Sequence, residues 1–244
     1  GVNLYDSFES YDYKKNNSQD MGDFSAPTLD VVRVAFIGVG ARGSGHAKQI
    51  AAIEGTEVVG ISDLYKDLAE KSSIICQGIG NGKRHKNIAI YSGNKDKWIA
   101  MLKEVKPDAV FISTNWDNHA PMAIETLKSG AHAFVEVPMA TSIEDLWDIV
   151  NTSEKTRKHC MMMENVNYGR DELMYLNMCR KGVIGDFLHA EAAYIHELRF
   201  QMKEEERGTG SWRTHHYAKS KGNLYPTHGL GPVAQYMNLV RGED

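Results

Sequence analysis

A chain of 244 residues with 42% apolar side chains is long enough to bury the core of one large domain or of two modest ones. Its 28 basic and 32 acidic residues give a formal net charge of -4, so no basic excess attracts nucleic acid or an anionic lipid surface. No run approaches the roughly 20 apolar residues that cross a bilayer. We therefore expect a globular protein with neither nucleic acid nor a membrane span among its interactions.

Residues 1–30 form a polar, tyrosine-rich arm in which Lys14 to Ser18 are polar without interruption. This composition is typical of an extended arm or a processed leader. It favours a periplasmic or exported protein, with a cytoplasmic location as the alternative. The three cysteines, Cys76, Cys160 and Cys179, are odd in number and widely spaced, so we interpret them as reduced packing residues and expect no metal site.

Residues 31–165 alternate apolar runs with helical patterns. Strands are expected at 32–39, 57–62, 109–112, 132–137 and 160–164. Helices are expected at 46–53, 66–78, 95–105, 119–129 and 142–156, the last capped by Ser142 with Asp145 in its first turn. Strands that alternate with helices indicate an α/β fold, a doubly wound parallel sheet of Rossmann type.

The pattern changes after Asn165, where we place a domain boundary. Residues 166–244 are expected to begin an α+β substrate domain, with a helix over 171–181, a turn over 182–185 and an antiparallel strand over 186–195. One strand and about 50 further residues cannot close a sheet with a covered face. We therefore expect this domain to be incomplete and the natural protein to continue beyond Asp244.

A glycine-rich turn joins the first expected strand to the first helix and fits G-x-G-x-x-G. Its glycines allow a tight turn, close approach of the pyrophosphate and packing of helix on strand. Asp63, at the end of the next strand, is placed to accept both ribose hydroxyls and to repel a 2′-phosphate, which selects NAD over NADP. The sequence thus predicts cofactor-binding residues at Gly38, Gly40, Ala41, Arg42, Gly43 and Asp63.

A polar loop follows the 109–112 strand, at the carboxyl edge where open α/β sheets bind ligands. As a group its residues should contact the cofactor, although a solvated loop or a helix cap is an even alternative for any one of them. They are Asn115, Trp116, Asp117, Asn118 and His119.

Glu136-Val137-Pro138 ends the 132–137 strand and resembles the Glu-Lys-Pro motif of the Gfo/Idh/MocA oxidoreductases. In that superfamily the lysine serves acid-base chemistry. Here the position is Val137, which cannot carry a proton, so alcohol dehydrogenation with that lysine as the base is not supported.

Four motifs together resemble glycoside hydrolase family 109, the NAD-dependent α-N-acetylgalactosaminidases. They are 136–138 (EVP), 163–170 (MENVNYGR), 210–216 (GSWRTHH) and 225–232 (YPTHGLGP). The resemblance runs from about Val32 to the C-terminus. It implies that hydride leaves C3 of the sugar, a base takes the C2 proton, the C1 oxygen is eliminated, water adds and the hydride returns. NAD-dependent glycosidases are recognised exceptions to the two-carboxylate route.

The residues alone also indicate a site, because aromatic and titratable groups crowd the stretch from Trp212 to His228. The alternative is that His215 and His216 lie on the surface and that Tyr225-Pro226 is a turn. Zinc is disfavoured because adjacent histidines lack the i, i+4 spacing of a helical pair. His46 and His132 are expected to be structural.

The resemblance distributes roles among these residues. Tyr168, His215 and His216 are the acid-base candidates. Glu136, Val137, Asn165 and Trp212 would border NAD. Substrate contacts would come from Tyr194, Arg213, Tyr225, Pro226, Thr227 and His228, although Tyr194 could equally be an ordinary strand aromatic.

Two other functions share the same first domain. One is an NAD-dependent sugar or inositol dehydrogenase, which would need a replacement base. The other is a non-catalytic NAD-binding regulator or assembly subunit, against which the density of titratable groups argues. In each enzymatic case the partner is a small-molecule sugar or glycan, and a homo-oligomer is possible.

Overall fold

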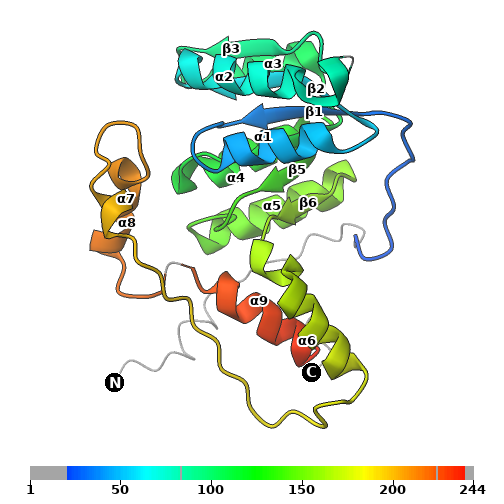
Figure 1. Cartoon of the computed structure of the whole chain (residues 1–244), viewed down its shortest axis with the longest axis vertical. Coiled ribbons are helices and arrows are strands. Elements are labelled where there is room, and N and C mark those ends of the chain that lie inside the picture. Colours follow the sequence, from blue (N-terminus) through cyan, green and yellow to red (C-terminus); the bar gives the residue numbers. More distant parts are fainter. Residues whose placement is uncertain (1–20, 83, 224, 240–244) are drawn as a thin grey trace.

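The computed structural model describes residues 21–82, 84–223 and 225–239. Six parallel strands form a single sheet in this part of the chain, in the order β3-β2-β1-β4-β5-β6 (Figure 1). They are β1 (Val32–Ile37), β2 (Thr56–Asp63), β3 (Ala89–Ser92), β4 (Ala109–Ile112), β5 (His132–Val135) and β6 (Cys160–Met162). The crossover connections hold α1 (Gly43–Ala52), α2 (Lys66–Gln77), η2 (Ile79–Gly82), α3 (Lys97–Val105), α4 (Trp116–Lys128) and α5 (Ile143–Thr156).

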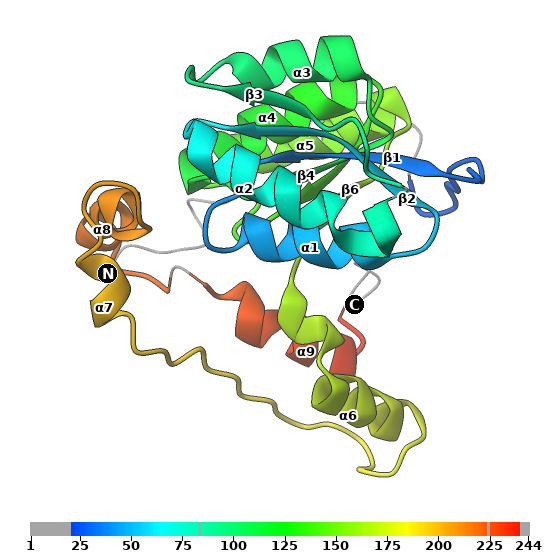
Figure 2. The same cartoon turned by 45° about the horizontal axis from the view of Figure 1, so that its top comes forward.

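Helices cover both faces of the sheet, as Figure 2 shows, and each face has its own apolar core. On β1, Val34 and Phe36 pack toward α1 and α2, whereas Ala35 and Ile37 pack toward α3, α4 and α5. This alternation follows from the two-residue period of a strand. The doubly wound parallel sheet predicted from the sequence is therefore confirmed.

Local boundaries differ from the prediction in a few places. β3 was not expected, although residues 88–91 form a short apolar run, because it is a four-residue edge strand with one exposed and three half-buried side chains. α4 begins at Trp116, three residues earlier than predicted, and this moves Trp116 and Asp117 from a loop into its first turn. The expected cap of α5 is present, since Ser142 Oγ accepts from the amide of Asp145 at 3.1 Å.

The second half begins with η3 (Asn165–Tyr168) and α6 (Arg170–Arg180) and ends with α7 (Arg199–Met202), α8 (Gly210–Lys219) and α9 (Thr227–Tyr236). α9 packs against α6 and η3, whereas α7 and α8 pack together beside the carboxyl ends of the strands (Figure 1). No helix within the described ranges combines the length and apolarity needed to span a membrane.

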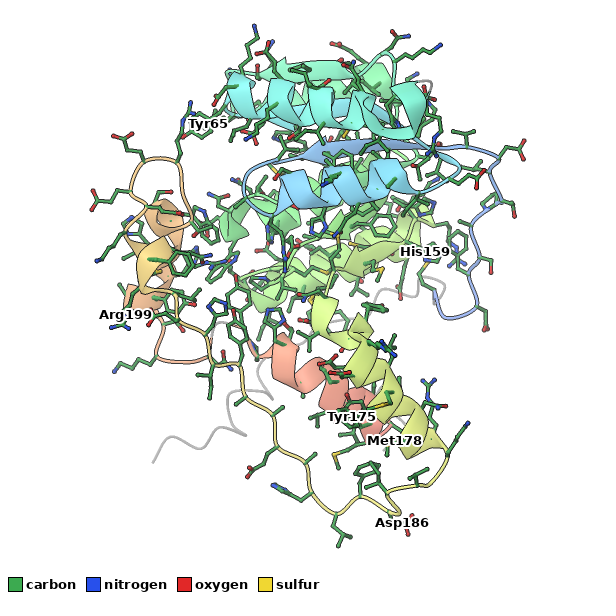
Figure 3. The ribbon with its side chains drawn as sticks, viewed as in Figure 1. Tyr65, His159, Tyr175, Met178, Asp186 and Arg199 are labelled. Carbon is green, nitrogen blue, oxygen red and sulfur yellow. The ribbon has the colours of Figure 1, made fainter. Side chains whose placement is uncertain are left out.

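The antiparallel strand predicted over 186–195 is not present in the described structure. This segment has no regular secondary structure, and Leu188 and Ile195 are more than 90% exposed. In Figure 3, Asp186 lies beyond the end of α6, away from the sheet. Alternation alone does not make a strand, since the backbone also needs a neighbouring strand to complete its hydrogen bonds, and no described segment pairs with this one.

Candidate active site

The glycine turn after β1 has the geometry of a phosphate cradle. Gly38 has a φ of 84°, and a Cβ there would lie 2.6 Å from the Ser113 carbonyl oxygen. A Cβ on Gly43 would lie 2.0 Å from the carbonyl oxygen of Gly38, so helix and strand meet only through glycine. A Cβ on Gly40 would meet nothing within 4 Å. Because Gly40 lines the cavity and no side chain caps α1, open space lies at the positive end of this helix, where a pyrophosphate fits.

Asp63 is fixed in place at the end of β2. Its two carboxylate oxygens accept from the backbone amides of Val39 at 2.8 Å and Tyr65 at 2.9 Å. The first contact ties the carboxylate to the glycine turn, and Asp63 lines the same cavity. This is the position from which an acidic side chain accepts ribose hydroxyls.

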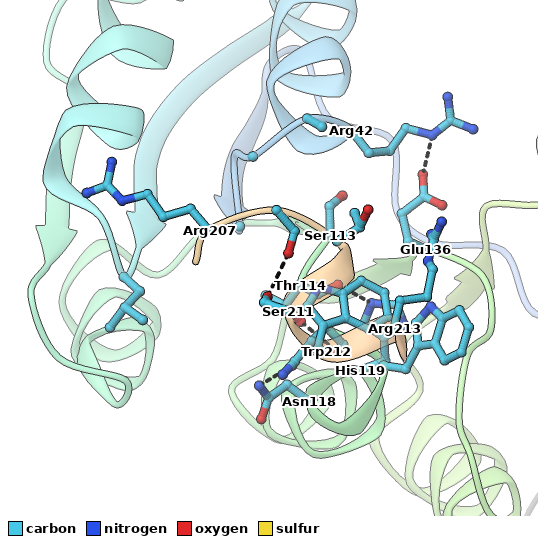
Figure 4. Close-up of a pocket in the computed structure, with 18 of the residues that line it drawn as sticks. Arg42, Ser113, Thr114, Asn118, His119, Glu136, Arg207, Ser211, Trp212 and Arg213 are labelled. Atoms are coloured by element: carbon cyan, nitrogen blue, oxygen red, sulfur yellow. Dashed lines mark hydrogen bonds and ion pairs between the residues drawn. The ribbon is translucent and has the colours of Figure 1, made fainter. Parts of the chain in front are cut away.

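A cavity of about 720 Å³ runs from these two features across the carboxyl ends of the strands to α8 (Figure 4). It joins both halves of the chain and has room for a dinucleotide with a small molecule beside it. Most predicted cofactor residues line it: Gly38, Gly40, Ala41, Arg42, Asp63, Asn115, Trp116, Asn118, His119, Glu136, Val137 and Trp212. So do four predicted substrate residues: Tyr194, Arg213, Tyr225 and His228.

Glu136 lies on the cavity wall between two cationic or potentially cationic side chains. His46 Nε2 lies 2.5 Å and Arg42 Nε 3.3 Å from Glu136 Oε1. Burial by itself would raise the pKa of Glu136, but the hydrogen bond from His46 and the charge of Arg42 outweigh it and hold the pKa below its usual range. Arg42 Nη2 also donates to Asn165 Oδ1 at 3.3 Å, so these residues form one polar network. His46, predicted to be structural, supports a cavity-lining carboxylate.

His119 is a buried member of the 115–119 group. Its Nδ1 lies 2.6 Å from the Pro138 carbonyl oxygen and its Nε2 lies 3.1 Å from that of Thr114. Burial lowers the pKa of His119, although the two carbonyl contacts oppose this shift. Both contacts join the start of α4 to neighbouring strand ends and shape the cavity wall.

Aromatic rings form the far wall. Trp116 contacts the rings of Trp212 and Tyr225 at centroid distances of 5.0 and 5.3 Å, and the Arg213 guanidinium lies 5.2 to 5.5 Å from all three. Val137 is 4% exposed and packs in the same cluster. Aromatic faces with a charged donor are the mix that sugar sites use.

A buried carboxylate lies behind this wall. Glu164, only 2% exposed, follows β6, and its Oε1 lies 2.6 Å from His228 Nδ1. The same oxygen accepts from the Val166 amide at 3.1 Å. The His228 ring stacks on Tyr225 at 5.2 Å and an interplanar angle of 4°. Sequence reasoning missed Glu164, although its place at the end of a parallel strand was a usable signal.

Other predicted residues lie outside the cavity. Tyr168 is 59% exposed on η3, and His215 is exposed on α8. His216 instead lines a neighbouring cavity of about 490 Å³ together with Pro226, and its Nε2 lies 3.5 Å from Asp117 Oδ2. Adjacent helical residues point about 100° apart, which is why the two histidines separate. The remaining predicted residues not on the cavity wall are Gly43, Asp117, Asn165 and Thr227.

Among the described residues, no three His, Cys, Asp or Glu side chains gather closely enough to hold a metal ion.

Comparison with protein-family models matches residues 32–164 to "Oxidoreductase family, NAD-binding Rossmann fold" and residues 168–244 to "Glycosyl hydrolase 109, C-terminal domain". Two curated relatives are "Glycosyl hydrolase family 109 protein 1" of Akkermansia muciniphila, 63% identical over 224 residues, and "Alpha-N-acetylgalactosaminidase" of Shewanella oneidensis, 52% identical over 230 residues. These alignments cover 92% and 94% of this chain but 46% and 49% of the relatives. The chain thus spans about half the length of the curated relatives it matches.

Among solved structures, a scyllo-inositol dehydrogenase from Lactobacillus casei with bound NAD(H) and scyllo-inositol superimposes with a TM-score of 0.67. The match covers 85% of this chain and 56% of the other, at 16% sequence identity. A myo-inositol 2-dehydrogenase from Lactobacillus plantarum also gives 0.67, at 17% identity, with 85% and 57% of the two chains covered. At these identities the likeness shows the fold alone.

Proposed function

The chain belongs to the Gfo/Idh/MocA oxidoreductase family with its NAD-binding Rossmann fold, and we propose that it acts as a glycoside hydrolase that uses NAD to cleave α-N-acetylgalactosaminides. The observation that carries the proposal is the Glu164–His228 pair beside Tyr225, on the cavity that also holds the glycine turn. The name of the Shewanella oneidensis relative supports the choice of substrate.

When bound, NAD supplies a reversible hydride acceptor, which allows a sugar carbon to be oxidised, the adjacent C–H to be made acidic and the hydride to be returned after elimination. Gly38 and Gly40 would hold the pyrophosphate, and Asp63 would hold the adenosine ribose. Glu136, held by Arg42 and His46, lines the same cavity and would border the nicotinamide.

His228 is the acid-base group that exchanges a proton with the sugar. Glu164 is an acceptor at Nδ1, so His228 carries its hydrogen there and leaves the Nε2 lone pair free for a sugar hydroxyl. When a proton arrives at Nε2, the buried carboxylate stabilises the charge that develops on the ring, as in other carboxylate–histidine pairs. This geometry supports His228 in the acid-base role more strongly than Tyr168 or His215, which lie outside the cavity.

Tyr225 and Arg213 position the sugar. Burial raises the pKa of Tyr225 to about 12, so its phenol keeps its proton at neutral pH. Arg213 Nη2 donates to the phenolic oxygen at 2.5 Å, which directs the phenolic proton toward other acceptors. Val137 and Trp116, which are 4% and 3% exposed, pack behind these two residues and support the apolar part of the wall. Val137 stands where related dehydrogenases have their lysine.

Incubation with p-nitrophenyl α-N-acetylgalactosaminide tests the proposal. Nitrophenol and NADH would be followed together, with and without added NAD, and bound cofactor would be assayed. Nitrophenol release without accumulation of NADH is expected. NADH accumulation without glycoside cleavage would instead identify a dehydrogenase. If neither nitrophenol nor NADH forms, the proposed activity is contradicted and only the assignment of the dinucleotide-binding fold stands.

A further inference from the structure

A contact between the two halves of the chain lies at the edge of the cavity, on the side of Asp63. Arg207, in the loop between α7 and α8, reaches Asp67 on the first turn of α2. Its Nη1 lies 2.9 Å from Asp67 Oδ2 and its Nη2 lies 3.3 Å from Oδ1, a two-pronged arrangement. The guanidinium also lies 4.1 Å above the ring centroid of Tyr65. In Figures 3 and 4, Tyr65 and Arg207 lie where this loop meets the start of α2.

This contact is beside the residue that recognises the ribose. Arg207 and Tyr65 line the cavity together with Asp63, and the Tyr65 amide donates to the Asp63 carboxylate. An arginine near this position is what dinucleotide-binding domains use to accept a 2′-phosphate. Here both terminal nitrogens of that arginine are committed to Asp67.

We infer that Asp67 is a second specificity-determining residue for the cofactor, which excludes NADP by holding the Arg207 guanidinium away from a 2′-phosphate. Asp63 favours the unmodified ribose directly, and Asp67 removes the cation that would otherwise offset the repulsion between Asp63 and a phosphate. The inference rests on the dinucleotide binding proposed above and concerns the choice between two dinucleotides.

Neighbouring charges do not replace this arrangement. Lys66 is engaged with Glu70 at 3.3 Å, one turn along α2. Glu204 and Glu206 line the cavity on the same loop as Arg207 and would repel a phosphate. Lys95 is a further cation on the cavity wall, so a variant test must separate its effect from that of Arg207.

The test is the ratio of Kd for NADP⁺ to Kd for NAD⁺, measured by calorimetric titration of the full chain. In D67N the freed guanidinium should pair with the 2′-phosphate and lower this ratio by about five- to tenfold. The double variant D67N/R207Q should return the ratio to its native value, because it lacks the freed guanidinium. A ratio that stays low in the double variant would identify Lys95 as the phosphate partner and contradict the role of Arg207. D171N is the matched control, since it removes an exposed first-turn carboxylate from α6, away from the cavity, and should leave the ratio unchanged.

The side chains of Asp67 and Arg207 are 61% and 52% exposed, so these variants remove no buried contact. An unchanged ratio in D67N, with both dinucleotides weakened equally, would overturn the inference and mean that the pair only closes the cavity. Failure of the native chain to bind either dinucleotide would overturn the cofactor assignment itself, and the inference with it.

Discussion

Glu164 Oε1 and His228 Nδ1 lie 2.6 Å apart although 64 positions separate the two residues in the sequence. The pair brings a buried carboxylate from the end of β6 to a histidine on α9. Glu164 thereby orients the His228 ring. Among the described residues, His228 is the only cavity-lining histidine whose partner is a fully buried carboxylate.

Replacing the carboxylate by an amide should slow the reaction while leaving binding largely intact. In E164Q the ring keeps a neighbour of the same shape but loses the charge that stabilises its protonated form, so kcat should fall about 100-fold with KM within about twofold. Steady-state kinetics with the nitrophenyl glycoside give both values.

The exposed His189–Glu191 pair offers a control of the same residue types, at 3.4 Å, and E191Q should behave as the native chain. Native kcat in E164Q would contradict the role of the pair. A collapse of thermal stability in E164Q alone would make Glu164 structural.

Tyr225 should act as a neutral phenol. Its pKa is raised to about 12, chiefly by burial, so no phenolate is present at pH 7 to 9. Y225F should lower kcat/KM about tenfold through loss of one hydrogen bond in the transition state and should leave the alkaline side of the pH–rate profile unchanged. The measurement is kcat/KM from pH 6 to 9.5 for both proteins. Disappearance of an alkaline limb in Y225F would assign the titrating group to this tyrosine instead.

Glu136 should make the fold sensitive to acid. Its folded pKa lies below the unfolded value of about 4.3, so its ion pairs contribute stability above that pH and lose it as the pH falls through the folded pKa. E136Q should therefore be less stable than the native chain at pH 7, and the difference should shrink below about pH 4. Thermal unfolding across this range measures it. A difference that stays constant with pH would mean that packing, and no charge effect, stabilises this residue.

Alanine substitutions at two glycines of the turn should have different effects, one on the stability of the fold and the other on NAD binding. G38A places a Cβ 2.6 Å from a carbonyl oxygen at a φ of 84°, so it should cost about 1–3 kcal/mol of unfolding free energy. G40A adds a methyl group where no protein atom other than those of residues 39–41 lies within 4 Å. It should leave the melting temperature within about 2 °C yet weaken NAD binding at least about tenfold, by occupying the pyrophosphate space.

Differential scanning fluorimetry and a titration with NAD⁺ on each variant give the two readouts. Unchanged NAD affinity in folded G40A would place the pyrophosphate elsewhere.

The sequence alone was enough to predict most strands, helices and cofactor-binding residues of the first half of the molecule. The strand–glycine turn–helix pattern and Asp63 at the end of the next strand are local features, because backbone sterics and two-residue periodicity depend on near neighbours. The buried strands and the Ser142 cap could be predicted for the same reason. β3 was not predicted, since a four-residue apolar run is too short to identify a strand by itself and this one depends on its pairing with β2.

Which side chains meet depends on the packing of whole elements. The tertiary structure separated His216 from His215 by helix phase, left Tyr168 outside the cavity, and left 186–195 without a partner strand. It also joined Glu164 to His228, and Asp67 to Arg207 across 140 positions. Motif recognition had marked His228 but could not identify its buried partner. Contacts between distant segments depend on how whole elements pack, and no local propensity or spacing encodes that packing.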